Sequence, residues 1–119
     1  MQSFKELIVW QKAMSLVEEV YKLMSFLPAN EKYALSDQIR RAVVSIPSNI
    51  AEGRGRNSER EFAYFLNIAN GSAYELQTQL IICQRLGYIK EEHFTPSFQL
   101  CDEVCKMLNV MINKLKAKG

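Results

Sequence analysis

The chain has 119 residues, of which 48% are hydrophobic and 24% are charged, and it contains only 5 glycines and 3 prolines. This length and composition fit a single globular domain over residues 1–119 and exclude disordered, collagen-like and low-complexity chains. The 15 lysines and arginines against 13 aspartates and glutamates leave a formal net charge of +2, which neither requires nor excludes a nucleic-acid ligand.

The N-terminal sequence and the cysteines favour a cytoplasmic protein without membrane contact. No stretch approaches the roughly 18 apolar residues of a membrane span, and residues 1–13 lack the apolar core of a secretory signal. Cys83, Cys101 and Cys105 are an odd number of thiols in a chain large enough to fold without disulfides. We therefore expect a soluble protein with reduced cysteines.

The first two predicted helices cover residues 5–26 and 32–53. In both segments apolar residues recur at helical spacing on one face, while charged residues occupy the other faces. Pro28 separates the two segments. Pro47 lies inside the second apolar stripe and has no N–H for the carbonyl of Val43, so we expect a kink there or a break into two shorter helices.

The third predicted helix follows a glycine-rich loop at residues 53–57. Ser58 and Glu61 have the spacing of a capping box directly before an apolar run. The helix continues to Leu86, where Gly87 can adopt the left-handed conformation that ends many helices. Its length is about 40 Å at a rise of 1.5 Å per residue.

The fourth predicted helix follows a linker at residues 88–95 and runs to the C-terminus. Thr95 is expected as its N-cap and Pro96 as its first residue. No segment alternates apolar and polar residues as a strand does. Four long helices with short connections predict an all-α fold, an antiparallel up-down four-helix bundle.

A second apolar strip lies on the third helix, on the side opposite its core face. At 100° per residue it brings together Tyr64, Ile68, Gly71, Ile82 and Leu86. We interpret this strip as an oligomer interface, in which Gly71 allows another helix to approach closely. The alternative is a monomer with scattered exposed apolar residues.

Five of the six arginines lie close together in the sequence: Arg40, Arg41, Arg54, Arg56 and Arg60. Guanidinium groups bind phosphates through a planar fork of donors, and a glycine-rich turn beside a helix start adds backbone N–H groups. The cluster is therefore a candidate nucleic-acid site. Glu52, Glu59 and Glu61 lie among the arginines and could pair with them, so an ordinary solvated surface is the alternative.

The C-terminus is a second basic element. Lys114, Lys116 and Lys118 follow the last acidic residue, Glu103. Positive charge stabilises the C-terminal end of a helix, and we prefer this explanation to a binding tail.

Residue types needed for catalysis are scarce. The only histidine, His93, falls in the predicted linker, so no serine or cysteine nucleophile gains a basic partner. Cys101 and Cys105 share a helix face, but zinc would need further ligands, and packed thiols are the better interpretation. We expect no enzymatic activity, no metal and no cofactor.

Asn49 falls at the edge of the second apolar stripe, where its amide needs hydrogen-bond partners. Two interpretations stay open. The side chain is either a buried polar clamp near the free carbonyl expected at Pro47, or part of a solvated kink.

Three strings in the sequence carry a resemblance to a known family. They are VWQKA at residues 9–13, SIPSNIAEGRGR at 45–56 and GSAYELQTQL at 71–80. In this order they resemble the 23S rRNA intervening-sequence proteins, a family of four-helix bundles. The positions that match the family strings are Asn49, Glu52, Gly53, Gly71, Glu75 and Leu76. Asn70 departs from the family pattern, because many relatives have a basic residue there.

The resemblance implies a bundle that assembles into a pentameric ring. Related accessory proteins of diversity-generating retroelements form basic pentamers that bind nucleic acid and a reverse transcriptase. By this likeness the chain is expected to be a homopentamer that binds RNA or DNA. The alternative is a scaffold ring that organises a partner protein without contact to nucleic acid.

Overall fold

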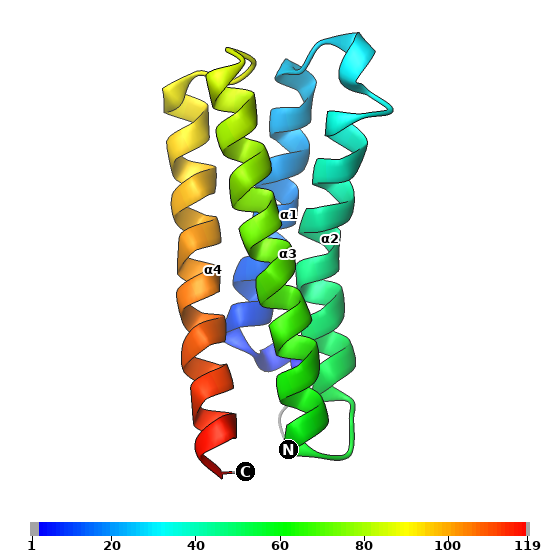
Figure 1. The fold of residues 1–119 in the computed structure, drawn as a ribbon, viewed down its shortest axis with the longest axis vertical. Helices are drawn as coiled ribbons and strands as arrows, with labels where there is room; N and C mark the ends of the chain where they lie inside the picture. The colour runs from blue at the N-terminus through cyan, green and yellow to red at the C-terminus, as the bar shows by residue number, and fades with distance from the viewer. Residues whose placement is uncertain (1–2, 119) are drawn as a thin grey trace.

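The structure is a computed structural model, and it describes residues 3–118. Four long helices make up most of it (Figure 1): α1 (Ile8–Leu23), α2 (Leu35–Arg54), α3 (Glu59–Arg85) and α4 (Glu91–Lys118). Three 3₁₀ turns flank α1 or precede α2: η1 (Phe4–Glu6), η2 (Met24–Phe26) and η3 (Ala29–Glu31). The described part of the chain contains no strand, so the all-α prediction is confirmed.

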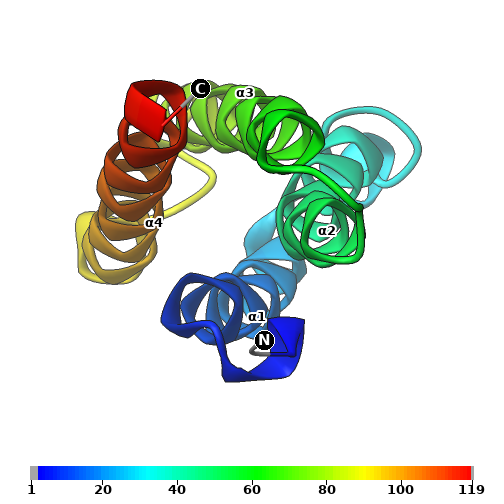
Figure 2. The same cartoon turned by 90° about the horizontal axis from the view of Figure 1, so that it is seen from below.

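The four helices pack side by side around one core, as seen in the end view of Figure 2. α2 contacts α1 and α3, α3 contacts α2 and α4, and α4 contacts α1. The connections from α1 to α2 and from α3 to α4 lie at one end of the long axis (Figure 1). The loop from α2 to α3 lies at the other end, near the end of α4. The α2–α3 loop and the end of α4, which are far apart in the sequence, therefore lie at the same end of the molecule.

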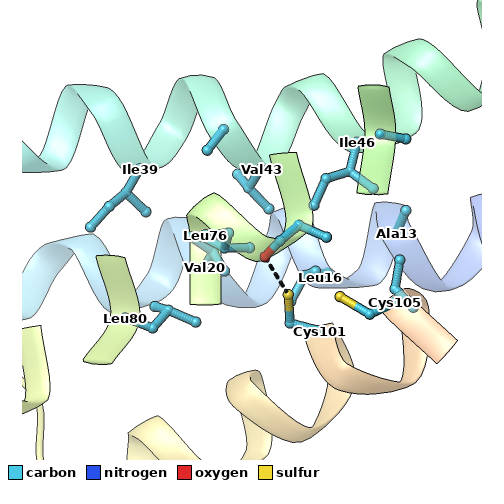
Figure 3. Packing of buried hydrophobic residues seen from close by; sticks show 14 of the residues in the cluster. Ala13, Leu16, Val20, Ile39, Val43, Ile46, Leu76, Leu80, Cys101 and Cys105 are labelled. Carbon is cyan, nitrogen blue, oxygen red and sulfur yellow. Dashed lines mark hydrogen bonds between the residues drawn. The ribbon is translucent and has the colours of Figure 1, made fainter. Parts of the chain in front are cut away.

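The apolar stripes of all four helices face this core. Figure 3 shows Leu16 of α1, Val43 of α2, Leu76 of α3 and Cys101 of α4 packed together. Each fully buried aliphatic side chain of this kind stabilises the fold by about 1.5–3 kcal/mol. Phe62 and Phe65 of α3 are only half-buried, because they lie at the end of the bundle.

Local hydrogen bonds define both ends of α3. At its start, the backbone N–H of Glu61 donates to Ser58 Oγ over 3.1 Å, as the capping box predicts. At its end, Gly87 has a φ of 78°, and the N–H of Tyr88 donates to the carbonyl of Cys83 over 2.9 Å. This is the Schellman arrangement that a glycine makes accessible. The predicted bounds of this helix are confirmed within one residue.

The predicted start of α4 is wrong. The helix begins at Glu91, so most of the predicted linker at residues 88–95 is helical, and Pro96 lies inside the helix instead of at its first position. The N–H of His93 donates to the carbonyl of Lys90 over 3.0 Å and closes the first turn. Pro96 removes only one backbone hydrogen bond close to the helix start, and the early acidic residues favour the positive end of the helix dipole.

The predicted break at Pro47 is also wrong, because α2 continues through this residue. Pro47 is buried, and α2 packs against both α1 and α3, so tertiary contacts hold the helix together despite the missing N–H. Ser48 Oγ donates to the carbonyl of Val44 over 2.8 Å. A side-chain donor thus binds a carbonyl beside the proline, in a helix that tertiary packing stabilises.

A short polar seam joins α3 to α4. Asn70 Nδ2 donates to Asn109 Oδ1 over 3.0 Å, and Asn109 Nδ2 donates to Tyr74 Oη over 3.2 Å. Asn70 is only 8% exposed. Asn70, where the resemblance implies a basic residue, therefore contributes to the packing of two helices.

Candidate nucleic-acid interface

A close contact between the end of α2 and the start of α3 positions the loop between them. A Cβ atom added to Gly53 would lie 2.6 Å from Phe65 Cβ and 3.1 Å from Phe62 Cδ1. Only glycine allows the two backbones to approach this closely. The glycine of the family string therefore has a structural role at the base of the arginine-containing loop.

The two loop arginines lie against aromatic rings. The guanidinium of Arg54 is 5.7 Å from the ring centre of Phe62, and that of Arg56 is 4.8 Å from the ring centre of Phe65. Arg56 also forms an ion pair with Glu52 at 2.7 Å. Arg54, Arg56 and Phe62 line a hollow of about 260 Å³, together with Asn57, Ser58 and other residues of this loop. Both arginines thus have defined positions at the surface.

Arg40 and Arg41 do not join this group. They precede Arg54 by 13–14 residues of the same helix, which is about 20 Å along its axis. Arg41 Nε pairs with Asp37 Oδ2 at 3.1 Å, and the guanidinium of Arg40 lies 5.8 Å from the ring centre of Tyr21. The structure therefore divides the arginine cluster of the sequence into two separate groups.

Arg60 lies on the α4 side of α3 and meets the C-terminal lysines there. Together with Tyr64, Leu115 and Lys116, it lines a groove of about 500 Å³ between α3 and α4. Lys118 Nζ lies 3.5 Å from Glu59 Oε1. The basic C-terminus, interpreted from the sequence as a separate feature, thus belongs to the same end of the molecule as the loop arginines.

We call this surface the basic end: Arg54, Arg56, Arg60, Lys116 and Lys118. Within residues 3–118, the side chains of Arg60 and Lys116 have neither an ion pair nor a hydrogen bond. Their charges face solvent between the two helices. The sequence analysis did not assign the lysines to this site. The predicted up-down arrangement of the four helices nevertheless implies that the end of α4 lies near the start of α3.

The apolar strip on α3 is exposed. Tyr64 is 62% exposed, Ile68 37%, Ile82 40% and Leu86 56%, and a Cβ atom added to Gly71 would have no neighbour within 4 Å. A second apolar surface lies between α1 and α2, where Trp10, Met14, Val44 and Pro47 line part of a groove of about 420 Å³. The molecule therefore presents apolar surfaces on two different faces.

The amide of Asn49 is a clamp within α2. Its Nδ2 donates to the carbonyl and to the Oγ of Ser45, over 2.8 and 2.9 Å. Ser45 Oγ in turn lies 2.9 Å from Ser72 Oγ on α3. Glu75 lies on the same side, beside a small hollow that it lines with Ser45 and Ser72. This part of the family pattern organises the contact between α2 and α3.

The residues considered for catalysis or metal binding are far from the basic end. His93 is exposed and stacks on Phe26 with ring centres 4.6 Å apart. All three cysteines are buried. Burial raises the pKa of Cys83 to about 11, and a hydrogen bond with Cys105 together with burial raises the pKa of Cys101. In the described part of the chain, no three histidine, cysteine or acidic residues are grouped as a metal site.

The comparisons with known proteins identify the family. A family model described as 23S rRNA-intervening sequence protein matches residues 5–110. The chain belongs to the 23S rRNA-intervening sequence protein family. The crystal structure of a protein of unknown function from the S23 ribosomal protein family of Bacteroides thetaiotaomicron is similar to this family member, with a TM-score of 0.81 and 31% identity. The alignment covers 88% of this chain and 98% of the Bacteroides protein.

No curated protein sequence matches this intervening-sequence family member. Within residues 3–118, none of its helices combines the length and the apolar character needed to cross a membrane.

Proposed function

We propose that this chain is a non-enzymatic nucleic-acid-binding protein that uses its basic end to hold the phosphate backbone of RNA or DNA. The observation that supports this proposal is the convergence of cationic side chains from the α2–α3 loop, the start of α3 and the end of α4. Arginine and lysine side chains grouped in this way bind phosphates and release counterions.

The proposed active form is a ring, a homopentamer of antiparallel up-down bundles. A single subunit with a net charge of +2 binds phosphate backbones weakly, but a ring repeats the basic end in every subunit and binds one long ligand through several sites. Ile68, Ile82 and Leu86 of the strip on α3 lie on a different face from the apolar groove between α1 and α2. We assign Tyr64 to the groove between α3 and α4, outside this subunit contact. Contacts between two different faces join subunits head to tail, which is the geometry of a ring when the rotation closes.

The test is the salt dependence of binding to a labelled structured RNA. The logarithm of the binding constant should fall linearly with the logarithm of salt concentration, with a slope of about −0.9 per phosphate neutralised on duplex DNA and about −0.7 on single strands. Replacing Arg54 and Arg56 together with Ala should flatten the slope and weaken binding to all sequences about equally.

A matched control removes the same charge elsewhere. Replacing Arg40 and Arg41 with Ala changes two charges on α2, about 20 Å from the loop, and should leave most of the affinity intact. Equal losses from both double variants would mean that net charge, and not the basic end, drives binding. Absence of binding by the intact protein at low salt would refute the proposal.

A scaffold function is the second candidate, and the exposed apolar groove between α1 and α2 favours it. In that case this groove binds a partner protein and not a neighbouring subunit, and the protein binds no nucleic acid. A single protein that stays bound to the purified chain after nuclease treatment, and is lost when Val44 is replaced by Glu with the oligomer mass unchanged in light scattering, would support the scaffold.

A further inference from the structure

We propose that the groove between the start of α3 and the end of α4 holds an unpaired nucleobase against the ring of Tyr64. The ligand of the basic end is then a single-stranded segment of nucleic acid, not a continuous duplex. This inference rests on the proposed nucleic-acid function and specifies its ligand.

The groove has the size and chemical composition of a site for one base. Its volume of about 500 Å³ lies within the roughly 300–1,000 Å³ of typical small-molecule sites. Ala63 and Leu115, both half-buried, supply apolar surface, and Tyr64 supplies an aromatic ring. Arg60 and Lys116 supply positive charge from the two helices that form the walls, and the carboxylate of Glu59, which also lines the groove, is paired with Lys118.

Tyr64 has the properties of a stacking platform. Its ring packs edge-on against Phe65, with ring centres 5.2 Å apart and planes at 86°, which limits its movement. The side chain is nevertheless 62% exposed. Bases of single strands stack on exposed aromatic rings of this kind, while nearby cations bind the flanking phosphates.

Among the cations of the basic end, two line this groove, and these two form no ion pair with a carboxylate of the described residues. Arg56 pairs with Glu52, and Lys118 pairs with Glu59, whereas Arg60 and Lys116 have no such contact within residues 3–118. A phosphate beside Tyr64 would therefore displace no existing ion pair of Arg60 or Lys116. The groove therefore combines cations that can bind a phosphate with an aromatic ring that can stack on a base.

Asn67 adds a polar group to the groove. Its Nδ2 donates to the carbonyl of Ala63 over 2.9 Å, which fixes the amide. Its Oδ1 accepts no hydrogen bond from residues 3–118, so it is available to an exocyclic amino group of adenine, cytosine or guanine. A duplex exposes phosphates but no free base face along its length, so Tyr64 would gain no stacking partner from it.

The experiment compares two labelled probes with equal numbers of phosphates, an unstructured DNA strand and a blunt-ended duplex of two annealed strands, by fluorescence anisotropy. Tyr64→Ala should weaken binding of the single strand by about fivefold or more, the loss expected when one base–aromatic stack is removed. Binding of the duplex should change by less than about twofold. Tyr64→Phe is the matched control, because it keeps the ring and should retain the affinity for the single strand.

The remaining outcomes are separable. Circular dichroism and light scattering on Tyr64→Ala should match the unmodified protein, and a lower mass would assign Tyr64 to the subunit interface and overturn the proposal. An equal effect on both probes, or no effect on either, would overturn the groove proposal while leaving the basic end to be judged by the loop-arginine variants. Failure of both probes to bind the unmodified protein would refute the proposed function itself.

Discussion

Replacement of Gly53 by Ala tests the close contact that positions the basic end. Alanine normally stabilises a helix interior by about 1 kcal/mol relative to glycine. Here, however, its methyl carbon would lie 2.6 Å from Phe65 Cβ, an atom fixed to the backbone of α3. Ordinary contact begins near 3.4 Å, so the ends of α2 and α3 must separate by about 0.8 Å.

The energetic cost follows from the atoms involved. Overpacking of a well-packed contact costs about 1–3 kcal/mol, and sometimes more. Separation of the helices also moves the rings of Phe62 and Phe65 away from Arg54 and Arg56, which removes cation–π contacts of about 0.5–1 kcal/mol each. After the gain in helix propensity, we expect the free energy of unfolding to fall by about 1–4 kcal/mol.

Urea denaturation at several protein concentrations measures this change, because oligomerisation makes stability depend on concentration. Gly55→Ala is the matched control. Its added Cβ would lie 3.6 Å from the nearest atom, and the φ of −81° suits alanine, so stability should stay the same or rise by up to about 1 kcal/mol. If Gly53→Ala is as stable as the unmodified protein, the structural explanation of this family glycine is wrong.

Three further predictions concern the cap of α3, the apolar strip and the buried thiols. Ser58→Ala should lower the free energy of unfolding by about 1 kcal/mol, and Ser58→Asp should restore most of it, as measured by urea denaturation. Ile68→Glu should lower the mass found by light scattering without loss of helical circular dichroism, and a monomeric unmodified protein at micromolar concentration would contradict the interface. Burial raises the pKa of Cys83 from 9.0 to about 11, so the unfolded thiol ionises first and stability should fall as the pH rises from 9 to 11. Cys83→Ala should show a smaller fall in denaturation experiments over this range, and equal falls would contradict the assignment. In the unmodified protein Cys83 should react slowly with thiol reagents until it unfolds.

The features predicted correctly from the sequence depend on neighbouring residues. Ser58 and Glu61 form their cap within one turn, and Gly87 ends α3 through contacts with residues a few positions away. The apolar stripes also indicated the buried face of each helix, since a long amphipathic helix has only one way to bury its apolar side.

The predictions of a helix break at Pro47 and of a helix start at Pro96 failed because tertiary packing decides whether a helix continues at a proline. Pro47 lies in a helix whose buried side continues on both sides of it, so the lost hydrogen bond is tolerated. Pro96 was interpreted as a first helical residue, a position that proline favours, but a turn closed by Lys90 precedes it. The helix propensity of a residue favours one local structure, but tertiary contacts can override it.

The candidate site was predicted in part for a related reason. Arg40 and Arg54 seemed to belong together because they are near in sequence, yet the rise of α2 separates them. Arg60 and Lys116 are far apart in sequence, and only the packing of α3 against α4 brings them to one groove. Residue types were visible in the sequence, but their grouping depends on the fold.

The polar seam between α3 and α4 also fixes the register of these two helices. An apolar interface alone distinguishes poorly between alignments that differ by one turn, or about 5.4 Å. A slide of this size would separate Asn70 from Asn109 and leave a buried amide without its partner, at a cost of about 1–3 kcal/mol. The same alignment places Arg60 opposite Lys116. An uncharged amide pair, about 15 Å along α3 from Arg60, therefore sets which charges face each other at the basic end.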